Sequence, residues 1–213
     1  MEPIAWLLGA GGAALGVVAD RFATGWPEHD EEHPPGRPLD WRTVVVAVVG
    51  ALAFGLLVPR FGGDALAVVI FGAWFATLVV GLATDLDQRL LPDVLTLPVI
   101  PVALVYALTG RNPLVGDEIV LAILAAVVIP LVLYLPSIPF GSGAFGLGDV
   151  KLLVGVGLLA GGSRALGSVI FALVLGGIVI AVLLLTRRIG RRSYLPFGPF
   201  FILGALWAVL LRS

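Results

Sequence analysis

The chain has 213 residues, of which 59% are hydrophobic and only 13% charged, and its mean hydropathy is +1.08. A soluble domain carries about 25% charged residues, so this composition excludes an ordinary soluble protein. The net charge of −1 gives no reason to expect a nucleic-acid-binding surface, and the absence of cysteine excludes disulfides, thiolate metal ligands and thiol nucleophiles.

The apolar residues come in long runs, each close to the ~20 residues that a helix needs to cross a bilayer. Eight spans are predicted, at residues 3–20, 43–59, 65–84, 93–109, 117–135, 147–162, 165–186 and 196–212. Helices are expected because an open sheet edge would leave backbone groups unpaired in lipid. The predicted fold is therefore all-α, a polytopic helical bundle in a lipid bilayer. The sixth span is short and glycine-rich enough to be partly re-entrant.

Small residues and prolines within the spans predict how the helices pack and bend. Gly12 and Gly16 in the first span, and Gly157 in the sixth, predict close approach between helices. Pro98 and Pro101 are expected to kink the fourth span, and Pro130 the fifth.

Only one connection between spans is long. Residues 21–42 contain four prolines and an acidic cluster, so they are expected to form an exposed loop, while residues 1–213 as a whole form a single membrane domain. His29 and His33 lie in this loop four residues apart, but without cysteine companions they predict no metal site. The first span follows Met1 almost directly with no basic region, so a cleaved signal peptide is not expected.

Lysine and arginine residues beside the spans predict the orientation. One side of the predicted membrane carries four of them and the other carries nine. The nine are Arg21, Arg37, Arg42, Arg89, Lys151, Arg187, Arg188, Arg191 and Arg192. This side is expected to be cytoplasmic, which places the loop at 21–42 inside and both termini outside.

Ionisable residues at membrane depth are functional candidates because burying them is costly. Four acids lie at span boundaries on the predicted cytoplasmic side: Asp85, Asp87, Asp93 and Asp149. Asp87 is expected to be solvated or paired locally with Arg89. Asp93 follows Pro92 at the start of a span, where a role in capping the helix is the alternative explanation.

Asp149 follows Gly146, Leu147 and Gly148 at the start of the sixth span. The two glycines permit backbone turns that side chains would forbid, and they let another chain approach closely. A simple helix-start acid would explain Asp149 about as well. Lys151 is expected either to position substrate and tune Asp149 or to snorkel to the interface.

Asp85 and Asp149 are 149 − 85 = 64 residues apart with two predicted spans between them, which returns both to one face at similar depth. Two carboxylates in a water-poor site cannot both be ionised cheaply, so one stays charged and the other protonated. The charged one can activate water as a general base while the protonated one polarises a scissile carbonyl. The spacing therefore permits an aspartyl dyad.

Three segments together resemble the signatures of the prepilin peptidases. D-L-D-Q-R-L-L-P-D at 85–93 resembles the first signature, G-L-G-D-V-K at 146–151 resembles the second, a G-x-G-D-x-K element, and L-P-F-G-P-F at 195–200 resembles the stretch that opens the last span. The resemblance implies a GxGD-type intramembrane aspartic peptidase of a variant that lacks the family's cysteine-rich zinc domain. It also implies that Asp85 and Asp149 are catalytic, with Gly146, Gly148, Asp93 and Lys151 in the surrounding active-site loops.

The same resemblance implies a substrate and a place in the cell. The enzyme would remove the short leader of type IV prepilins, or of the pseudopilins of type II secretion, at the cytoplasmic face of the inner or plasma membrane. No cofactor, metal or nucleic-acid partner is expected, and no oligomeric state follows from the sequence. Relatives with the zinc domain often also N-methylate the new terminus. Because that domain and any glycine-rich cofactor signature are absent here, we predict peptidase activity alone.

Two alternatives remain open at the level of the sequence. One is a transporter or a non-enzymatic assembly subunit of a pilus or secretion system, since broken helices and intramembrane acids also fit transporters. The other is the same dyad acting on a different membrane substrate, such as preflagellins, because the preflagellin peptidases resemble this family.

Overall fold

The computed structural model describes residues 2–29, 35–140, 145–190 and 196–212, and the regular elements in these ranges are helices. The sequence predictions also use residues outside these ranges: part of the loop's acidic cluster (Asp30, Glu31 and Glu32), one of its four prolines (Pro34), and His33, Arg191, Arg192 and Leu195. The chain forms two compact units, Met1–Thr96 and Leu97–Ser213, and each is described by itself.

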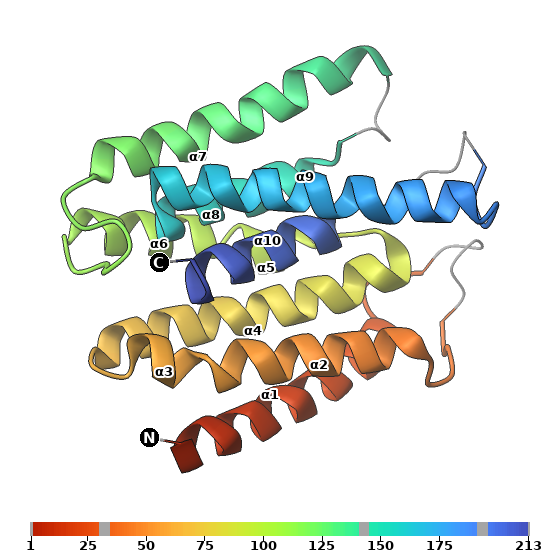
Figure 1. The fold of residues 1–213 in the computed structure, drawn as a ribbon, viewed down its shortest axis with the longest axis horizontal. Coiled ribbons are helices and arrows are strands. Elements are labelled where there is room, and N and C mark those ends of the chain that lie inside the picture. The colour runs from red at the N-terminus through yellow and green to blue at the C-terminus, as the bar shows by residue number, and fades with distance from the viewer. Residues whose placement is uncertain (1, 30–34, 141–144, 191–195, 213) are drawn as a thin grey trace. The chain divides into compact units, whose positions relative to one another are not determined.

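The first unit contains α1 (Glu2–Ala23), α2 (Trp41–Gly55), α3 (Leu57–Phe61), α4 (Ala65–Gln88) and α5 (Asp93–Thr96). α1 and α2 pack side by side, and α4 contacts both (Figure 1). The predicted small-residue contact between helices is confirmed. A β-carbon on Gly16 would lie 2.5 Å from the Val46 carbonyl oxygen, and one on Gly12 would overlap the Gly50 carbonyl. Glycine at these positions therefore sets how closely α1 and α2 approach.

The second unit contains α6 (Val99–Leu108), α7 (Ile119–Tyr134), the 3₁₀ helix Leu135–Phe140, α8 (Leu147–Ala160), α9 (Gly162–Leu185) and α10 (Gly198–Leu210). α8 contacts α6, α7, α9 and α10, so it is the central helix of this unit. Its close approach to α7 is again confirmed, because a β-carbon on Gly157 would lie 2.5 Å from the Cα of Ala126. The buried Asn112 side chain donates a hydrogen bond to the Leu159 carbonyl at 3.0 Å and so satisfies the far end of α8.

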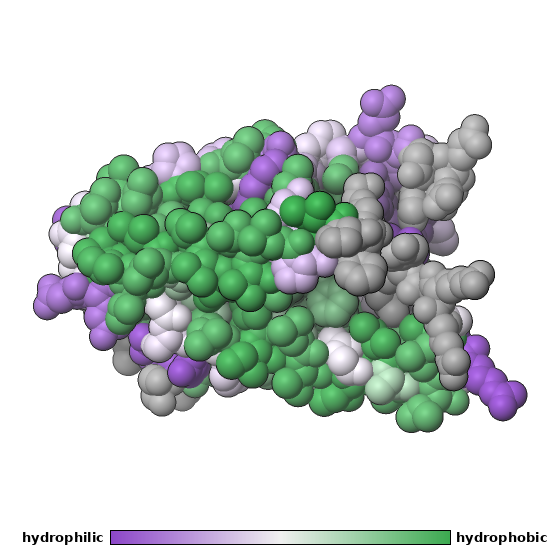
Figure 2. Space-filling model, turned by 90° about the horizontal axis from the view of Figure 1, so that it is seen from above, coloured by the Kyte–Doolittle hydropathy of each residue, from purple (hydrophilic) through white to green (hydrophobic). Residues whose placement is uncertain are grey.

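The helices confirm a multi-pass membrane protein. Five are long and apolar enough to cross a bilayer: Pro3–Ala23, Trp41–Phe61, Ala65–Gln88, Ile119–Ile138 and Gly162–Leu185. The other three predicted spans correspond to the shorter segments Asp93–Leu108, Leu147–Ala160 and Gly198–Leu210. Apolar side chains cover most of the face seen in Figure 2, as expected of a surface that meets lipid.

Proline ends one helix at the predicted place. The fourth predicted span breaks between Thr96, where α5 ends, and Val99, where α6 begins, and Pro98 stands at this break. Pro130 lies inside α7, which continues past it to Tyr134.

Candidate active site

Asp85 lies in the last turn of α4 and is only 4% exposed. The helix ends at Gln88 because Arg89 adopts a left-handed conformation, with φ at 57°, and its N–H donates to the Asp85 carbonyl at 2.9 Å. The proline that follows at 92 disfavours a helical conformation for Leu91, which explains why the chain leaves the helix here. The sequence thus holds Asp85 at the boundary of a long apolar helix.

Asp87 is 6% exposed, so the prediction that it is solvated is wrong. Its hydrogen-bond partners also differ from Arg89, the local partner that was expected. Asp87 accepts hydrogen bonds from Arg37 Nε at 2.7 Å and Arg42 Nη1 at 3.4 Å, and it lies 3.2 Å from His29 Nε2. The reason is that residues from the loop between α1 and α2, and from the start of α2, lie against the end of α4.

This loop was predicted to be exposed, but two of its side chains are largely buried. The side chain of His29 is 5% exposed and that of Arg37 is 12% exposed. Gln88 on α4 also binds the loop, because its side-chain amide donates to the carbonyls of Ala23 and Pro27, both at 3.2 Å. The last turn of α4 is therefore anchored to the loop at two successive residues.

Asp20 is a buried acid that the sequence analysis missed. It has no exposed surface, and it accepts hydrogen bonds from Thr43 Oγ1 and Arg37 Nη2, both at 2.6 Å, as well as from Arg21. The sequence does mark Asp20 as a candidate functional residue, because it is an ionisable residue in the last turn of an apolar span.

The charge of Arg37 is secured by these contacts. Burial alone would lower the pKa of its guanidinium, but the hydrogen bonds to Asp87 and Asp20 outweigh that and raise the pKa above its ordinary value. Arg37 therefore carries a full positive charge among three carboxylates: Asp20, Asp40 and Asp87.

Asp149 lies in the second unit, in the first turn of α8, and is partly buried. The helix is capped by Gly146, whose backbone N–H donates a hydrogen bond to the Asp149 carboxylate. An acid three residues after the cap that binds the cap N–H is one half of a capping box. The helix-start explanation therefore describes the local geometry of Asp149.

The two glycines before Asp149 do not adopt backbone conformations reserved for glycine. Gly146 has φ at −79°, and neither Gly146 nor Gly148 has a positive φ. A β-carbon on Gly146 would lie 3.6 Å from Asp149 Oδ2, an ordinary contact distance. The glycine-only turn that these two residues would permit is therefore not adopted, and close approach by another chain stays a prediction.

The remaining predicted site residues lie beside these two acids in sequence. Asp93 is exposed and is the first residue of α5, in the first unit. Lys151 is half-buried on α8, two residues after Asp149. Because successive residues of a helix are about 100° apart, the side chains of Asp149 and Lys151 leave the helix in nearly opposite directions.

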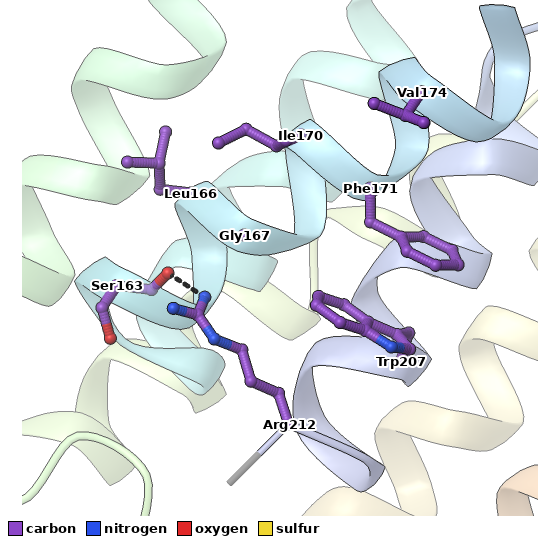
Figure 3. A pocket seen from close by; sticks show the side chains of 8 residues that line it. All are labelled: Ser163, Leu166, Gly167, Ile170, Phe171, Val174, Trp207 and Arg212. Carbon is purple, nitrogen blue, oxygen red and sulfur yellow. Dashed lines mark hydrogen bonds between the residues drawn. The ribbon is translucent and has the colours of Figure 1, made fainter.

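A groove on the second unit lies elsewhere and has different chemistry. It has a volume of about 540 Å³ and lies between α9 and α10, where Phe171 stacks on Trp207 (Figure 3). Arg212 points to its edge and donates a hydrogen bond to the Ser163 carbonyl at 2.5 Å. None of its lining residues is an acid, so it does not supply a general base for hydrolysis. Among the described residues, no group of three or more His, Cys, Asp or Glu side chains is placed to hold a metal ion.

Comparison with known protein families gives a match that spans both acids. The family described as the type IV leader peptidase family matches residues 73–182, which include Asp85 and Asp149. No solved structure matches the chain significantly.

Curated relatives have related names. The chain is 33% identical over 175 residues to a "Type 4 prepilin-like proteins leader peptide-processing enzyme" of Escherichia coli O78:H11, covering 81% of this chain and 62% of the relative. It is 34% identical over 155 residues to a "Prepilin leader peptidase/N-methyltransferase" of Burkholderia pseudomallei, covering 73% of this chain and 50% of the relative. A Pseudomonas putida protein with the same name is 29% identical over 169 residues, covering 79% of this chain and 58% of the relative. The chain thus spans between half and two thirds of the length of these relatives. None of these names favours the transporter alternative.

Proposed function

Because this chain belongs to the type IV leader peptidase family, we propose that it is a membrane-embedded aspartic endopeptidase that removes the leader of type IV prepilins or pseudopilins. The observation that carries the proposal is the family match over residues 73–182, which contains both acids of the predicted dyad. The burial of Asp85 and the partial burial of Asp149 support it, since a dyad needs surroundings poor in water.

The proposed reaction uses the two carboxylates in different protonation states. One ionised carboxylate takes a proton from water, and the water oxygen attacks the carbonyl carbon of the scissile peptide bond. The other carboxyl, which is protonated, donates a hydrogen bond to the carbonyl oxygen. As the tetrahedral intermediate collapses, the carbon–nitrogen bond breaks and the carboxyl that took the proton from water gives it to the leaving amine. A new carboxylate and a new amino terminus remain, and the two enzyme carboxyls return to their starting protonation states. No covalent bond to the enzyme forms.

We place the reaction at the cytoplasmic face of the inner or plasma membrane. The nine lysine and arginine residues on the side of Asp85 and Asp149 support this orientation. The basic leader expected of a prepilin would then stay on the side where it is made. We propose peptidase activity alone, because the chain has no cysteine with which to build the zinc domain of longer relatives.

The proposal is tested by co-expressing the protein with pilin-like precursors from its own genome and following the mobility shift that leader removal causes. Asp85→Asn and Asp149→Asn keep the side-chain size but cannot titrate, so each is expected to abolish the shift at normal membrane levels. Asp117→Asn is the matched control, since Asp117 is an exposed acid on the predicted opposite side. Cleavage by either dyad variant at the rate of the parent would overturn the assignment of the catalytic residues.

If the parent cuts no precursor, the substrate class is wrong. Preflagellin-type precursors are then the next substrates to try in the same assay.

A further inference from the structure

A single side chain, Arg37, joins three segments of the first unit. Its guanidinium donates from Nη2 to Asp20 at the end of α1 at 2.6 Å, and from Nη1 to Asp40 at the cap of α2 at 2.5 Å. Its third nitrogen, Nε, donates to Asp87 in the last turn of α4 at 2.7 Å. Contacts of this charge-assisted kind are about twice as strong as neutral hydrogen bonds, and the planar guanidinium fixes their directions.

The loop is shaped to present this arginine. Gly36, immediately before it, has φ at 84°, a conformation that L side chains rarely adopt, and its N–H donates to the Thr24 carbonyl at 2.9 Å. The Arg37 carbonyl in turn accepts a hydrogen bond from Arg21 Nη1 at 2.8 Å. The backbone on both sides of the guanidinium is therefore fixed.

The last turn of α4 needs a positively charged partner such as Arg37. A carboxylate in the last turn of a helix is disfavoured by the negative end of the helix dipole, and burial adds a desolvation cost. Asp87 is in that position and is buried. Without a cation at Asp87, the last turn would be expected to unwind so that the carboxylate reaches water. That turn also contains Asp85, two residues earlier.

Asp85 and Asp87 leave the helix in nearly opposite directions, because two residues correspond to about 200° of rotation. A cation on the Asp87 side therefore fixes the turn without taking up the carboxylate of Asp85. We propose that Arg37 is a positioning residue, which holds the last turn of α4 against α1 and so fixes the Asp85 carboxylate for hydrolysis. The inference rests on the proposed function for its catalytic part, but not for the fixing of the turn.

A thiol reporter tests the fixing of the turn without any substrate. The chain has no cysteine, so Thr84→Cys introduces a single thiol directly before Asp85, at a position with no exposed surface. In this background we expect Arg37→Gln to raise the rate of maleimide labelling at least tenfold. Arg111→Gln is the matched control, because Arg111 is an exposed arginine in the second unit. It is expected to change the rate less than threefold.

Kinetics then test the consequence for catalysis in the chain without the thiol. A misplaced catalytic group lowers the chemical step by up to about 10²-fold, so Arg37→Gln is expected to lower kcat tenfold or more with KM little changed. Arg37→Lys should recover only part of kcat, since one ammonium cannot bridge three carboxylates in the same way. If Arg37→Gln does not accumulate in the membrane, Arg37→Lys replaces it in the labelling assay, because one ammonium keeps a positive charge beside Asp87 but cannot bridge three carboxylates, so a smaller rise in the labelling rate is expected.

The outcomes separate the two hypotheses. Faster labelling in the Arg37 variant supports the fixing of the turn, even if no precursor is cut by the parent, in which case the proposed function alone fails. Labelling and kcat equal to those of Arg111→Gln overturn the role of Arg37. Faster labelling with unchanged kcat would also overturn it, because the turn would then not control the position of Asp85.

Discussion

Asp85 and Asp149 are held in place by different kinds of contact. The turn that contains Asp85 is fastened by long side chains from a loop, of which Arg37 is 50 residues away from its partner Asp87. Asp149 is held by the backbone of Gly146, only three residues before it, at the start of a helix of 14 residues. One acid therefore depends on contacts that are remote in sequence, and the other depends on local geometry.

The largest effect on stability is expected in the remote network. Asp20→Ala removes a fully buried carboxylate and leaves Arg37 and Thr43 without one of their partners. Breaking a buried ion pair typically costs about 3–5 kcal/mol, and we expect a loss at the lower end of that range because Arg21 can reach water. Thermal unfolding in detergent measures the effect, with Asp117→Ala as an exposed acid that should leave the midpoint unchanged. A loss no larger than that of the control would mean that the network does not hold the unit together.

The difference between the two regions also explains what the sequence could predict. Apolar runs long enough to span a membrane locate the helices, and boundary acids within them indicate Asp85 and Asp149. The environment of Asp87 was not predictable in the same way, because its partners Arg37 and His29 come from a loop whose composition indicates exposure. Hydropathy describes segments one at a time, whereas the contacts of this acid depend on how three segments meet.

The glycines before Asp149 show a different gap between sequence and structure. Their G-x-G-D pattern permits an unusual turn, yet Gly146 has an extended conformation that any residue adopts. The presence of a glycine in the sequence does not reveal whether the backbone conformation, a neighbouring helix or a bound chain requires a residue without a side chain. At Gly12, Gly16 and Gly157 the neighbouring helix requires it, and there the packing prediction was correct.

At Asp149 we expect a substitution to affect activity much more than stability. Asp149→Ala removes an acid that contributes half of a capping box, so the unfolding free energy should fall by only about 1 kcal/mol. If the proposed function is correct, precursor cleavage should nevertheless be abolished. Unfolding midpoint and cleavage are measured on the same preparation. A loss of stability as large as that of Asp20→Ala would show that the two regions do not differ as their contacts indicate.

A smaller effect is expected at the cap itself. Gly146→Ser places a favoured capping residue where the backbone already has a suitable conformation, so stability should be unchanged or rise by a few tenths of a kcal/mol. If the glycine serves the close approach of a substrate backbone, cleavage should fall by roughly tenfold, as expected when a contact to the reacting segment is weakened. The ratio of kcat to KM is the measurement, and Gly177→Ser is the control, because a β-carbon there would meet open space. Unchanged cleavage would leave Gly146 with a structural role only.

No effect is expected from removing metal ions. The chain has no cysteine, and the ring of His29 is already engaged, with Nε2 3.2 Å from Asp87 Oδ2 and 3.1 Å from the Gln88 amide. These contacts give His29 a role in holding the loop against α4, in which a metal would compete with Asp87. We therefore expect 1,10-phenanthroline to leave both the unfolding midpoint and precursor cleavage unchanged. A drop in the midpoint that zinc restores would place a metal in the loop after all. It would make the fixing of Asp85 depend on that metal as well as on Arg37, and the two regions would then differ even more than their hydrogen bonds indicate.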